Sequence, residues 1–209
     1  MTRRRFITLE GGEGVGKSTQ LSALAGAICA RGHKVVTTRE PGGSEGAEAI
    51  LALLMQGSEE RWSARAEALL FAAARADHVE KLIQPALERG EWVLCDRFID
   101  SSRAYQGGAS GLGDDDVMAL HKFGSDGLMP DRTLLLTLDM EIGGYRAMVR
   151  DGKFFADRFA AKSMEYHEKL NMALAEYAKN EPSRFRSIDA SGTPENVTAR
   201  LVAEIEDLL

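Results

Sequence analysis

Short apolar runs alternate with longer amphipathic segments along most of the chain. The runs are rich in β-branched and other apolar residues, a pattern typical of strands buried on both faces, and they occupy residues 6–9, 35–38, 92–95, 134–138 and 185–188. Between them, apolar residues recur at helical spacing over residues 17–31, 44–55, 63–89, 114–125, 141–149, 158–180 and 194–208. This alternation predicts an α/β fold in which helices flank a five-stranded parallel sheet.

The composition is that of an ordinary globular chain with an acidic balance. The 209 residues include 26 Lys and Arg against 32 Asp and Glu, a formal net charge of −6, which disfavours a polymeric nucleic acid as ligand. No repeat or long linker divides the chain, so we expect one domain over residues 1–209.

Neither the apolar stretches nor the cysteines point to an extracytoplasmic protein. The first apolar run stops at Glu10, too soon for a signal peptide, and no stretch approaches the roughly 20 apolar residues of a membrane span. Cys29 and Cys95 match neither a disulfide framework nor a metal-ligand spacing, so we expect two buried free thiols. We therefore expect a cytoplasmic protein.

The segment GGEGVGKS at residues 11–18 is the strongest chemical signal. It satisfies the pattern G-x-x-x-x-G-K-[ST] of P-loop NTPases, directly after the first predicted strand and directly before a predicted helix. Glycines allow backbone N–H groups to face a phosphate, Lys17 reaches the β- and γ-phosphates, and the Ser18 hydroxyl is a ligand for Mg²⁺. The segment predicts a site for a nucleoside triphosphate and Mg²⁺.

Two other features indicate which nucleotide is bound and which carboxylate lies near its metal ion. None of the three asparagines begins an Asn-Lys-x-Asp segment of the kind that reads guanine, which favours ATP. A second carboxylate is expected near the metal, and Asp96 at the end of a strand is preferred over Asp139 because Arg97 follows it.

Four further residues predict a second, anionic substrate. Arg39 and Arg97 both follow predicted strands, and the carboxyl ends of parallel strands converge on one crevice. Phe71 and Arg75 lie four residues apart on one helix face, where a ring can stack on a base and a guanidinium can donate to it. From the spacing alone, a core position in the apolar run of residues 69–74 is favoured for Phe71 over a place in a base-binding site.

Together these segments resemble the thymidylate (dTMP) kinases. The resemblance rests on residues 11–19, the Thr-Arg-Glu-Pro-Gly-Gly segment at 38–43, Phe71 with Arg75, Asp96-Arg97, and Tyr105-Gln106-Gly107, and it runs from the first strand to the last helix. It implies a P-loop nucleoside monophosphate kinase fold, in-line transfer of the γ-phosphoryl group of ATP to dTMP in dTTP biosynthesis, and a homodimer.

The resemblance also implies residue roles. Phe71 would stack on thymine, Arg75 would donate to its O4, and Arg97 with Arg39 would hold the dTMP phosphate. Tyr105 would crowd the 2′ position, and Gln106 would line the base pocket with Ser101 and Ser102. The ATP-binding residues would be Gly11, Gly12, Glu13, Gly14, Val15, Gly16, Lys17, Ser18, Thr19 and Arg150. The metal would be held by Ser18 and Asp96, and the catalytic residues would be Lys17, Arg97, Arg150 and Glu13.

The resemblance also implies a lid, which is expected at about residues 145–158. Because residues 11–18 contain no arginine, the γ-phosphate arginine is expected in the lid, as in the bacterial type, and Arg150 is preferred over Arg146 and Arg158. Ala160 stands where many relatives have Glu. A kinase for another nucleotide or small metabolite, or an ATPase switch without a small acceptor, remain the alternative functions.

Overall fold

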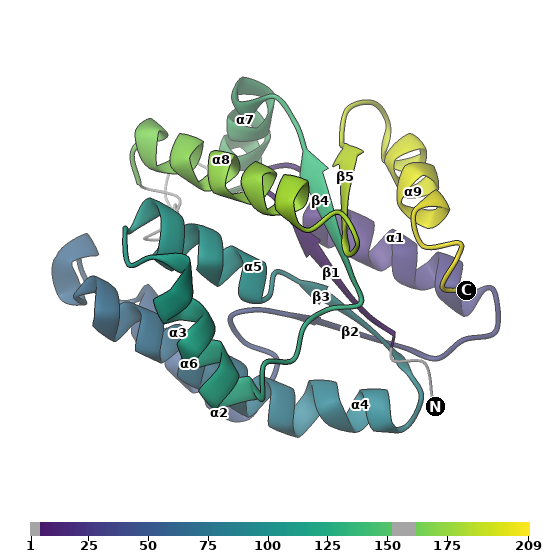
Figure 1. Cartoon of the computed structure of the whole chain (residues 1–209). Helices are drawn as coiled ribbons and strands as arrows, with labels where there is room; N and C mark the ends of the chain where they lie inside the picture. The colour runs from purple at the N-terminus through teal and green to yellow at the C-terminus, as the bar shows by residue number, and fades with distance from the viewer. Residues whose placement is uncertain (1–4, 152–161) are drawn as a thin grey trace.

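A five-stranded parallel sheet forms the centre of the protein, whose computed structural model describes residues 5–151 and 162–209 (Figure 1). The strands run in the order β2-β3-β1-β4-β5, and every neighbouring pair is parallel. Their bounds are β1 (Phe6–Glu10), β2 (Val35–Arg39), β3 (Trp92–Asp96), β4 (Arg132–Thr137) and β5 (Phe185–Asp189). The expected α/β architecture is thereby confirmed.

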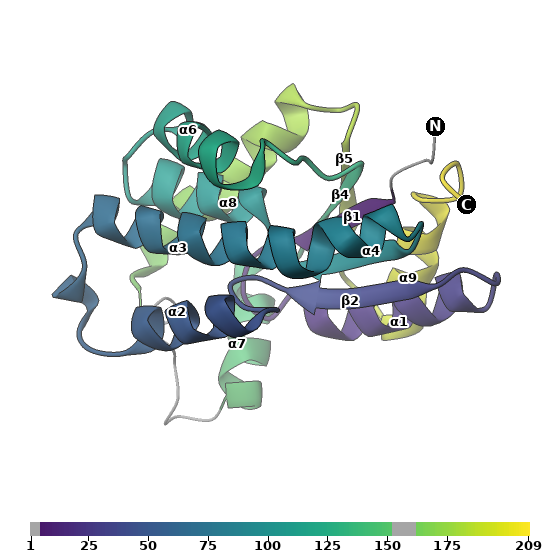
Figure 2. The same ribbon diagram turned by 90° about the horizontal axis from the view of Figure 1, so that it is seen from below.

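Helices cover both faces of the sheet. Their bounds are α1 (Lys17–Cys29), α2 (Glu45–Met55), η1 (Glu59–Arg61), α3 (Ala64–His78), η2 (Val79–Ile83), α4 (Gln84–Glu88), α5 (Ile99–Ser102), η3 (Arg103–Ala109), α6 (Asp114–Ser125), α7 (Met140–Asp151), α8 (Met164–Asn180) and α9 (Pro194–Ala203). Helices α3 and α4 continue one another through the π-helical segment η2, as Figure 2 shows. This matches the single long helix predicted for residues 63–89.

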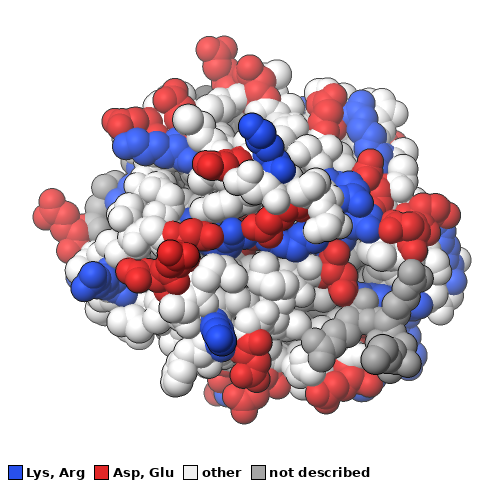
Figure 3. Space-filling model, in the orientation of Figure 1, with Lys and Arg blue, Asp and Glu red and all other residues white. Residues whose placement is uncertain are grey.

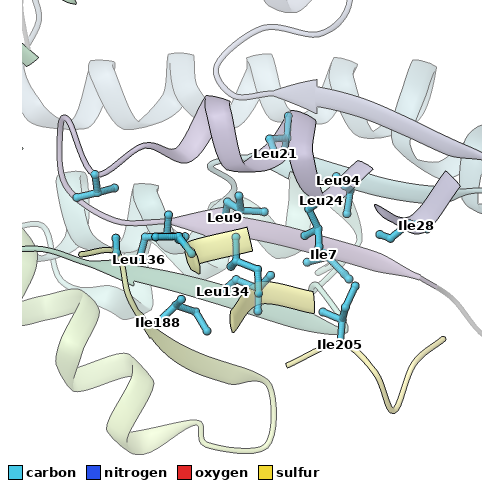
Figure 4. Close-up of a cluster of buried hydrophobic side chains, with 14 of the residues drawn as sticks. Ile7, Leu9, Leu21, Leu24, Ile28, Leu94, Leu134, Leu136, Ile188 and Ile205 are labelled. Atoms are coloured by element: carbon cyan, nitrogen blue, oxygen red, sulfur yellow. The ribbon is translucent and has the colours of Figure 1, made fainter. Parts of the chain in front are cut away.

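The alternation of side chains along β1 divides the core between the two faces. Ile7 and Leu9 pack with Leu24 of α1 and Leu201 of α9 on one face, where Figure 4 shows the cluster. Phe6 points the other way and packs with residues of η2, α4 and α6. The inner strands β1, β3 and β4 bury both of their faces, which explains their apolar runs in the sequence, whereas the edge strands β2 and β5 contain exposed residues.

Several predicted boundaries were wrong by a few residues. Four strands end on a charged residue one position beyond the apolar run, while β4 begins at Arg132, two residues earlier than predicted. Helix α9 ends at Ala203, before the predicted 208. The predicted start of the 158–180 helix lies partly outside the described residues, and α8 itself begins at Met164.

One helical segment was missed altogether. Residues 99–109 form α5 and the π-helical η3, although the sequence IDSSRAYQGGA has no amphipathic period. Ion pairs hold the segment instead, since Asp100 is fully buried against Arg103 and Arg184. Tertiary charge pairing here stabilises a helix that local propensity does not favour.

Of the two cysteines expected to be buried, only one is. Cys95 is buried, but Cys29 is exposed because it lies off the stripe of α1 that faces the sheet. The run of aspartates at 114–116 forms the first turn of α6, the helix predicted for residues 114–125, and Asp114 also pairs with Arg103. Within the described residues, no helix is both long and apolar enough to cross a membrane.

Candidate active site

A cavity of about 740 Å³ opens where β1, β2, β3 and β5 end. It is lined by most of the predicted site residues, namely Glu13, Gly14, Val15, Gly16, Lys17, Ser18, Thr19, Arg39, Phe71, Arg75, Asp96, Arg97, Ser101, Ser102, Tyr105 and Gln106. Gly11 and Gly12 are not among its lining residues. The convergence expected from the carboxyl ends of parallel strands is therefore present.

The phosphate loop joins β1 to α1 through a turn that requires glycine. Gly11 has a φ of 140°, and a Cβ there would stand 2.4 Å from the carbonyl oxygen of Leu136. The ammonium of Lys17 donates to the carbonyls of Gly11 at 3.1 Å and Gly12 at 2.7 Å. Burial, with Arg97 nearby, lowers the pKa of Lys17 to about 8. The loop therefore holds its lysine beneath the place where phosphates can bind.

Ser18 and Asp96 lie side by side at the start of α1 and the end of β3. The Ser18 hydroxyl donates to Asp96 Oδ2 at 2.7 Å, whereas Asp139 accepts the backbone N–H groups of Glu141 and Ile142 at the start of α7. Hydroxyl and carboxylate oxygens are the donors that Mg²⁺ prefers, so Ser18 and Asp96 fit a magnesium ion shared with substrate phosphates. No set of three or more His, Cys, Asp or Glu in the described part of the chain could hold a metal alone.

Arg97 spans the floor of the cavity from the end of β3. Its backbone has a φ of 68°, in the left-handed region, and its N–H donates to the Leu9 carbonyl at 3.0 Å. The guanidinium then reaches Gly11 O and Ser101 Oγ, both at 3.2 Å, and Glu13 Oε1 at 2.6 Å. An uncommon backbone conformation thus aims a forked donor at the phosphate loop.

Glu10, which the sequence reading did not single out, braces this turn. It is fully buried, and it accepts the Phe98 N–H at 2.8 Å and the Ser101 hydroxyl at 2.6 Å. Burial and the nearby charge of Asp100 raise the pKa of Glu10 to about 7. A glutamate that ends an apolar strand and precedes a glycine loop gives no local sign of these partners.

The aromatic and polar residues predicted for a base lie together at another part of the cavity. Arg75 Nη2 donates to Ser102 Oγ at 2.6 Å, and Gln106 Nε2 donates to Glu67 Oε1 at 3.2 Å. Phe71 also packs against the cluster around Leu170 and Leu174, so it is both a lining residue and a core residue. The pocket combines a ring face with oriented polar groups, as a planar heterocycle requires.

The structure describes the side chains of only some of the other predicted arginines. Arg39 is exposed, and its Nη2 donates to both carboxylate oxygens of Glu48. Arg146 of α7 lines the cavity. The side chain of the preferred Arg150 lies outside the described residues, as do Arg158, Ala160 and the lid from residue 152 onward.

The cavity lining has more cations than carboxylates although the chain as a whole is acidic: it includes Lys17, Arg39, Arg75, Arg97 and Arg146 against Glu13, Glu40 and Asp96. Acidic and basic side chains are interspersed over the face seen in Figure 3. Inside the cavity the cations have carboxylate neighbours, Arg97 with Glu13 and Arg75 with Glu40. The acidic net charge therefore coexists with a site whose arginines are prearranged for anions.

Comparisons with known proteins agree with this geometry. A profile of the family described as "Thymidylate kinase" matches residues 9–201. The thymidylate kinase of Rhizorhabdus wittichii is 57% identical over 205 residues, covering 98% of each chain. That of Caulobacter vibrioides is 48% identical over 201 residues, covering 96% of this chain and 95% of the relative. The crystal structure of thymidylate kinase from Ehrlichia chaffeensis superposes with a TM-score of 0.77 at 30% identity, covering 96% of this chain and 98% of that one.

The phosphate loop, the pocket of Phe71, Arg75 and Gln106 beside it, and the whole-length similarity have one common explanation. The chain belongs to the thymidylate kinase family of P-loop nucleoside monophosphate kinases, phosphotransferases that use ATP to phosphorylate dTMP.

Proposed function

We propose that this chain binds dTMP and ATP in the one cavity and transfers the γ-phosphoryl group to the dTMP phosphate with Mg²⁺. The observation that best supports this proposal is that a single cavity is lined both by the phosphate loop at Lys17 and by Phe71 and Arg75, the residues proposed to bind the base. Two nucleotides held in a single site can react in line without a covalent intermediate on the enzyme.

The acceptor is held at both of its ends. Phe71 stacks on thymine and Arg75 donates to O4, so a cytosine, which carries an amino donor at that position, is rejected. Arg97, assisted by Arg39, binds the dTMP phosphate, and Tyr105 excludes a 2′-hydroxyl. The contact of Tyr105 OH with Glu13 Oε1 at 3.5 Å supports this placement, because it brings the tyrosine next to the acceptor side of the phosphate loop.

The donor phosphates lie on residues 11–19 and α1. Backbone N–H groups and Lys17 bind the β- and γ-phosphates, while Glu13 faces the acceptor. Ser18 and Asp96 would hold Mg²⁺, which supplies a positive charge that offsets the charge of the phosphates when it is bound. Lys17, Arg97 and a lid arginine stabilise the remaining negative charge of the transition state.

A lid at about residues 145–158 keeps water from the transferring group, since water would otherwise hydrolyse ATP. Arg150 is our first choice for the arginine that contacts the γ-phosphate. Arg146, one turn earlier on α7, lines the cavity and so supports delivery of an arginine from this helix. Arg158 is the third candidate.

A panel of acceptors tests the reaction. A coupled assay of ADP formation with dTMP, dUMP, UMP, CMP and AMP should give the highest kcat/KM with dTMP. A preference for another acceptor would instead favour a different nucleotide kinase. ADP formation from ATP that no acceptor stimulates would favour an ATPase switch.

We also propose that the chain is one kinase domain, cytoplasmic and homodimeric. Leu69 on α3 is 55% exposed and Phe123 on the adjacent α6 is 93% exposed, which supports a protein contact over these helices. Light scattering should give a dimer mass for the wild type and a monomer mass for Phe123→Glu. A monomeric wild type would contradict the assembly but not the reaction.

A further inference from the structure

A largely buried chain of hydrogen bonds leads from β2 to Arg75, and the reaction described above uses none of its other members. Arg75 Nε donates to Glu40 Oε2 at 2.7 Å, and the other carboxylate oxygen, Oε1, lies 3.0 Å from His78 Nδ1. His78 Nε2 lies 2.7 Å from Thr38 Oγ1. The Arg75, Glu40 and His78 side chains are respectively 4%, 5% and 0% exposed. These three side chains are therefore shielded from bulk water, whereas Thr38 is half-buried.

The chemistry of the groups assigns a direction to each bond. The carboxylate of Glu40 beside a guanidinium can only accept, so His78 Nδ1 is the donor to it. In a neutral imidazole Nε2 then accepts the proton of the Thr38 hydroxyl. None of these four side chains has a buried nitrogen or oxygen atom without a hydrogen-bond partner, which is the condition under which a buried polar network holds one geometry.

The network holds the Arg75 guanidinium on three sides. Glu40 takes Nε, Ser102 takes Nη2 at 2.6 Å, and the ring of Phe98 lies 5.3 Å below the guanidinium carbon. None of these contacts uses Nη1. The guanidinium is therefore oriented by protein groups before any acceptor binds.

The backbone of α3, of the end of β2 and of the loop after it brings these hydrogen-bonded side chains together. Arg75 and His78 are three residues apart on one face of α3, and Thr38 and Glu40 are two residues apart at the end of β2. The Glu40 N–H continues the sheet by donating to Asp96 O at 2.9 Å. A Cβ on Gly43 would stand 2.4 Å from His78 Nε2, so only glycine lets this loop close over the histidine.

We propose that His78, acting through Glu40, is a positioning residue for base recognition. It holds Arg75 in the orientation that accepts a 4-oxo pyrimidine and rejects a 4-amino pyrimidine. The inference rests on the proposed role of Arg75 and adds the source of its fixed geometry. His78 does not line the cavity, so it has no direct contact with the acceptor by which to act.

The test compares dTMP with dCMP in variants of the full-length enzyme. His78→Leu removes both bonds at similar volume and should raise the KM for dTMP by about tenfold, as expected for a lost buried hydrogen bond to a charged group. The ratio of kcat/KM for dTMP over dCMP should fall with it. The KM for ATP should stay within about twofold, because the phosphate loop makes no contact with this chain of bonds.

Two milder variants and one control complete the design. His78→Asn keeps an amide donor near the position of Nδ1 and should restore most of the dTMP preference. Thr38→Val removes only the hydroxyl and should change the ratio in the same direction as His78→Leu but less. Asp77→Asn alters the neighbouring residue of α3, which pairs with Lys81 and Ser44 instead, and should leave the ratio unchanged.

The outcomes separate this inference from the proposed function. If Arg75→Ala leaves the KM for dTMP unchanged, the role of Arg75 itself is wrong. If Arg75→Ala acts as expected while His78→Leu and Thr38→Val leave the dTMP to dCMP ratio unchanged, only the inference is wrong. Equal losses for dTMP and ATP in Thr38→Val would mark a general structural role and overturn it as well.

Discussion

Arg97 Nη2 lies 2.6 Å from Glu13 Oε1, which ties the end of β3 to the phosphate loop across the cavity floor. The two residues are far apart in the sequence, and the contact depends on the left-handed backbone at Arg97. In the proposed function, an acceptor phosphate at Arg97 would therefore bind within reach of the phosphate loop.

Arg97→Ala should lower kcat/KM for dTMP by about a hundredfold or more, because it removes charge stabilisation at the acceptor phosphate. Steady-state kinetics with each substrate varied in turn will measure it. Arg31→Ala, which alters a surface arginine paired with Glu206, is the matched control and should match the wild type. An unchanged kcat/KM for dTMP would place the acceptor phosphate elsewhere.

Arg75→Ala should impair dTMP binding while ATP affinity is spared, because in the proposed function this arginine contacts the base of dTMP and not ATP. We expect a loss of about 1.5–3 kcal/mol in dTMP binding free energy, measured by calorimetry. Arg65→Ala on the exposed side of the same helix should have no effect. Equal weakening of both nucleotides would indicate a folding defect.

Arg150→Ala should lower kcat by about a thousandfold while changing ATP affinity little, since an arginine on the γ-phosphate acts in the transition state. Single-turnover rates and ATP binding should be compared for Arg146→Ala, Arg150→Ala and Arg158→Ala. Normal turnover in Arg150→Ala together with loss of turnover in Arg158→Ala would assign the role to Arg158.

ATP binding should weaken above about pH 8, where Lys17 loses its proton in the free enzyme. The Kd should rise by up to about tenfold per pH unit, because a neutral amine no longer attracts the phosphates. Lys17→Arg should remove this dependence, since a guanidinium keeps its proton at these pH values. A Kd for the wild type that is constant from pH 7 to pH 10 would contradict the lowered pKa.

Stability should fall as pH rises toward 7 because of Glu10. Its pKa is raised from 4.5 to about 7 by burial, so the folded state binds a proton there that the unfolded state has already released. The resulting contribution is fully present below pH 4.5 and is lost as pH rises through about 7. Urea unfolding of wild type and Glu10→Gln should therefore show the variant gaining relative stability from pH 5 to pH 8. A difference that does not change with pH would contradict this.

The sequence by itself determined the alternation of strands and helices, the phosphate loop and the arginines that follow the strands. These depend on local features: apolar periodicity, glycine spacing and the order of residues at strand ends. The helix at residues 99–109 could not be predicted in this way, because buried ion pairs of Asp100 with Arg103 and Arg184 stabilise it.

Only the tertiary structure decided which side chains hold the predicted ones in place. Glu40 meets Arg75 across 35 residues of chain, and Glu10 meets the Phe98 N–H across 88. His78 looks like one of four scattered histidines in the sequence, yet it is fully buried against Glu40. A hydrogen bond between residues so far apart leaves no periodic trace in the sequence, because it depends on how β1, β2, β3 and α3 pack rather than on the local conformation of any of them.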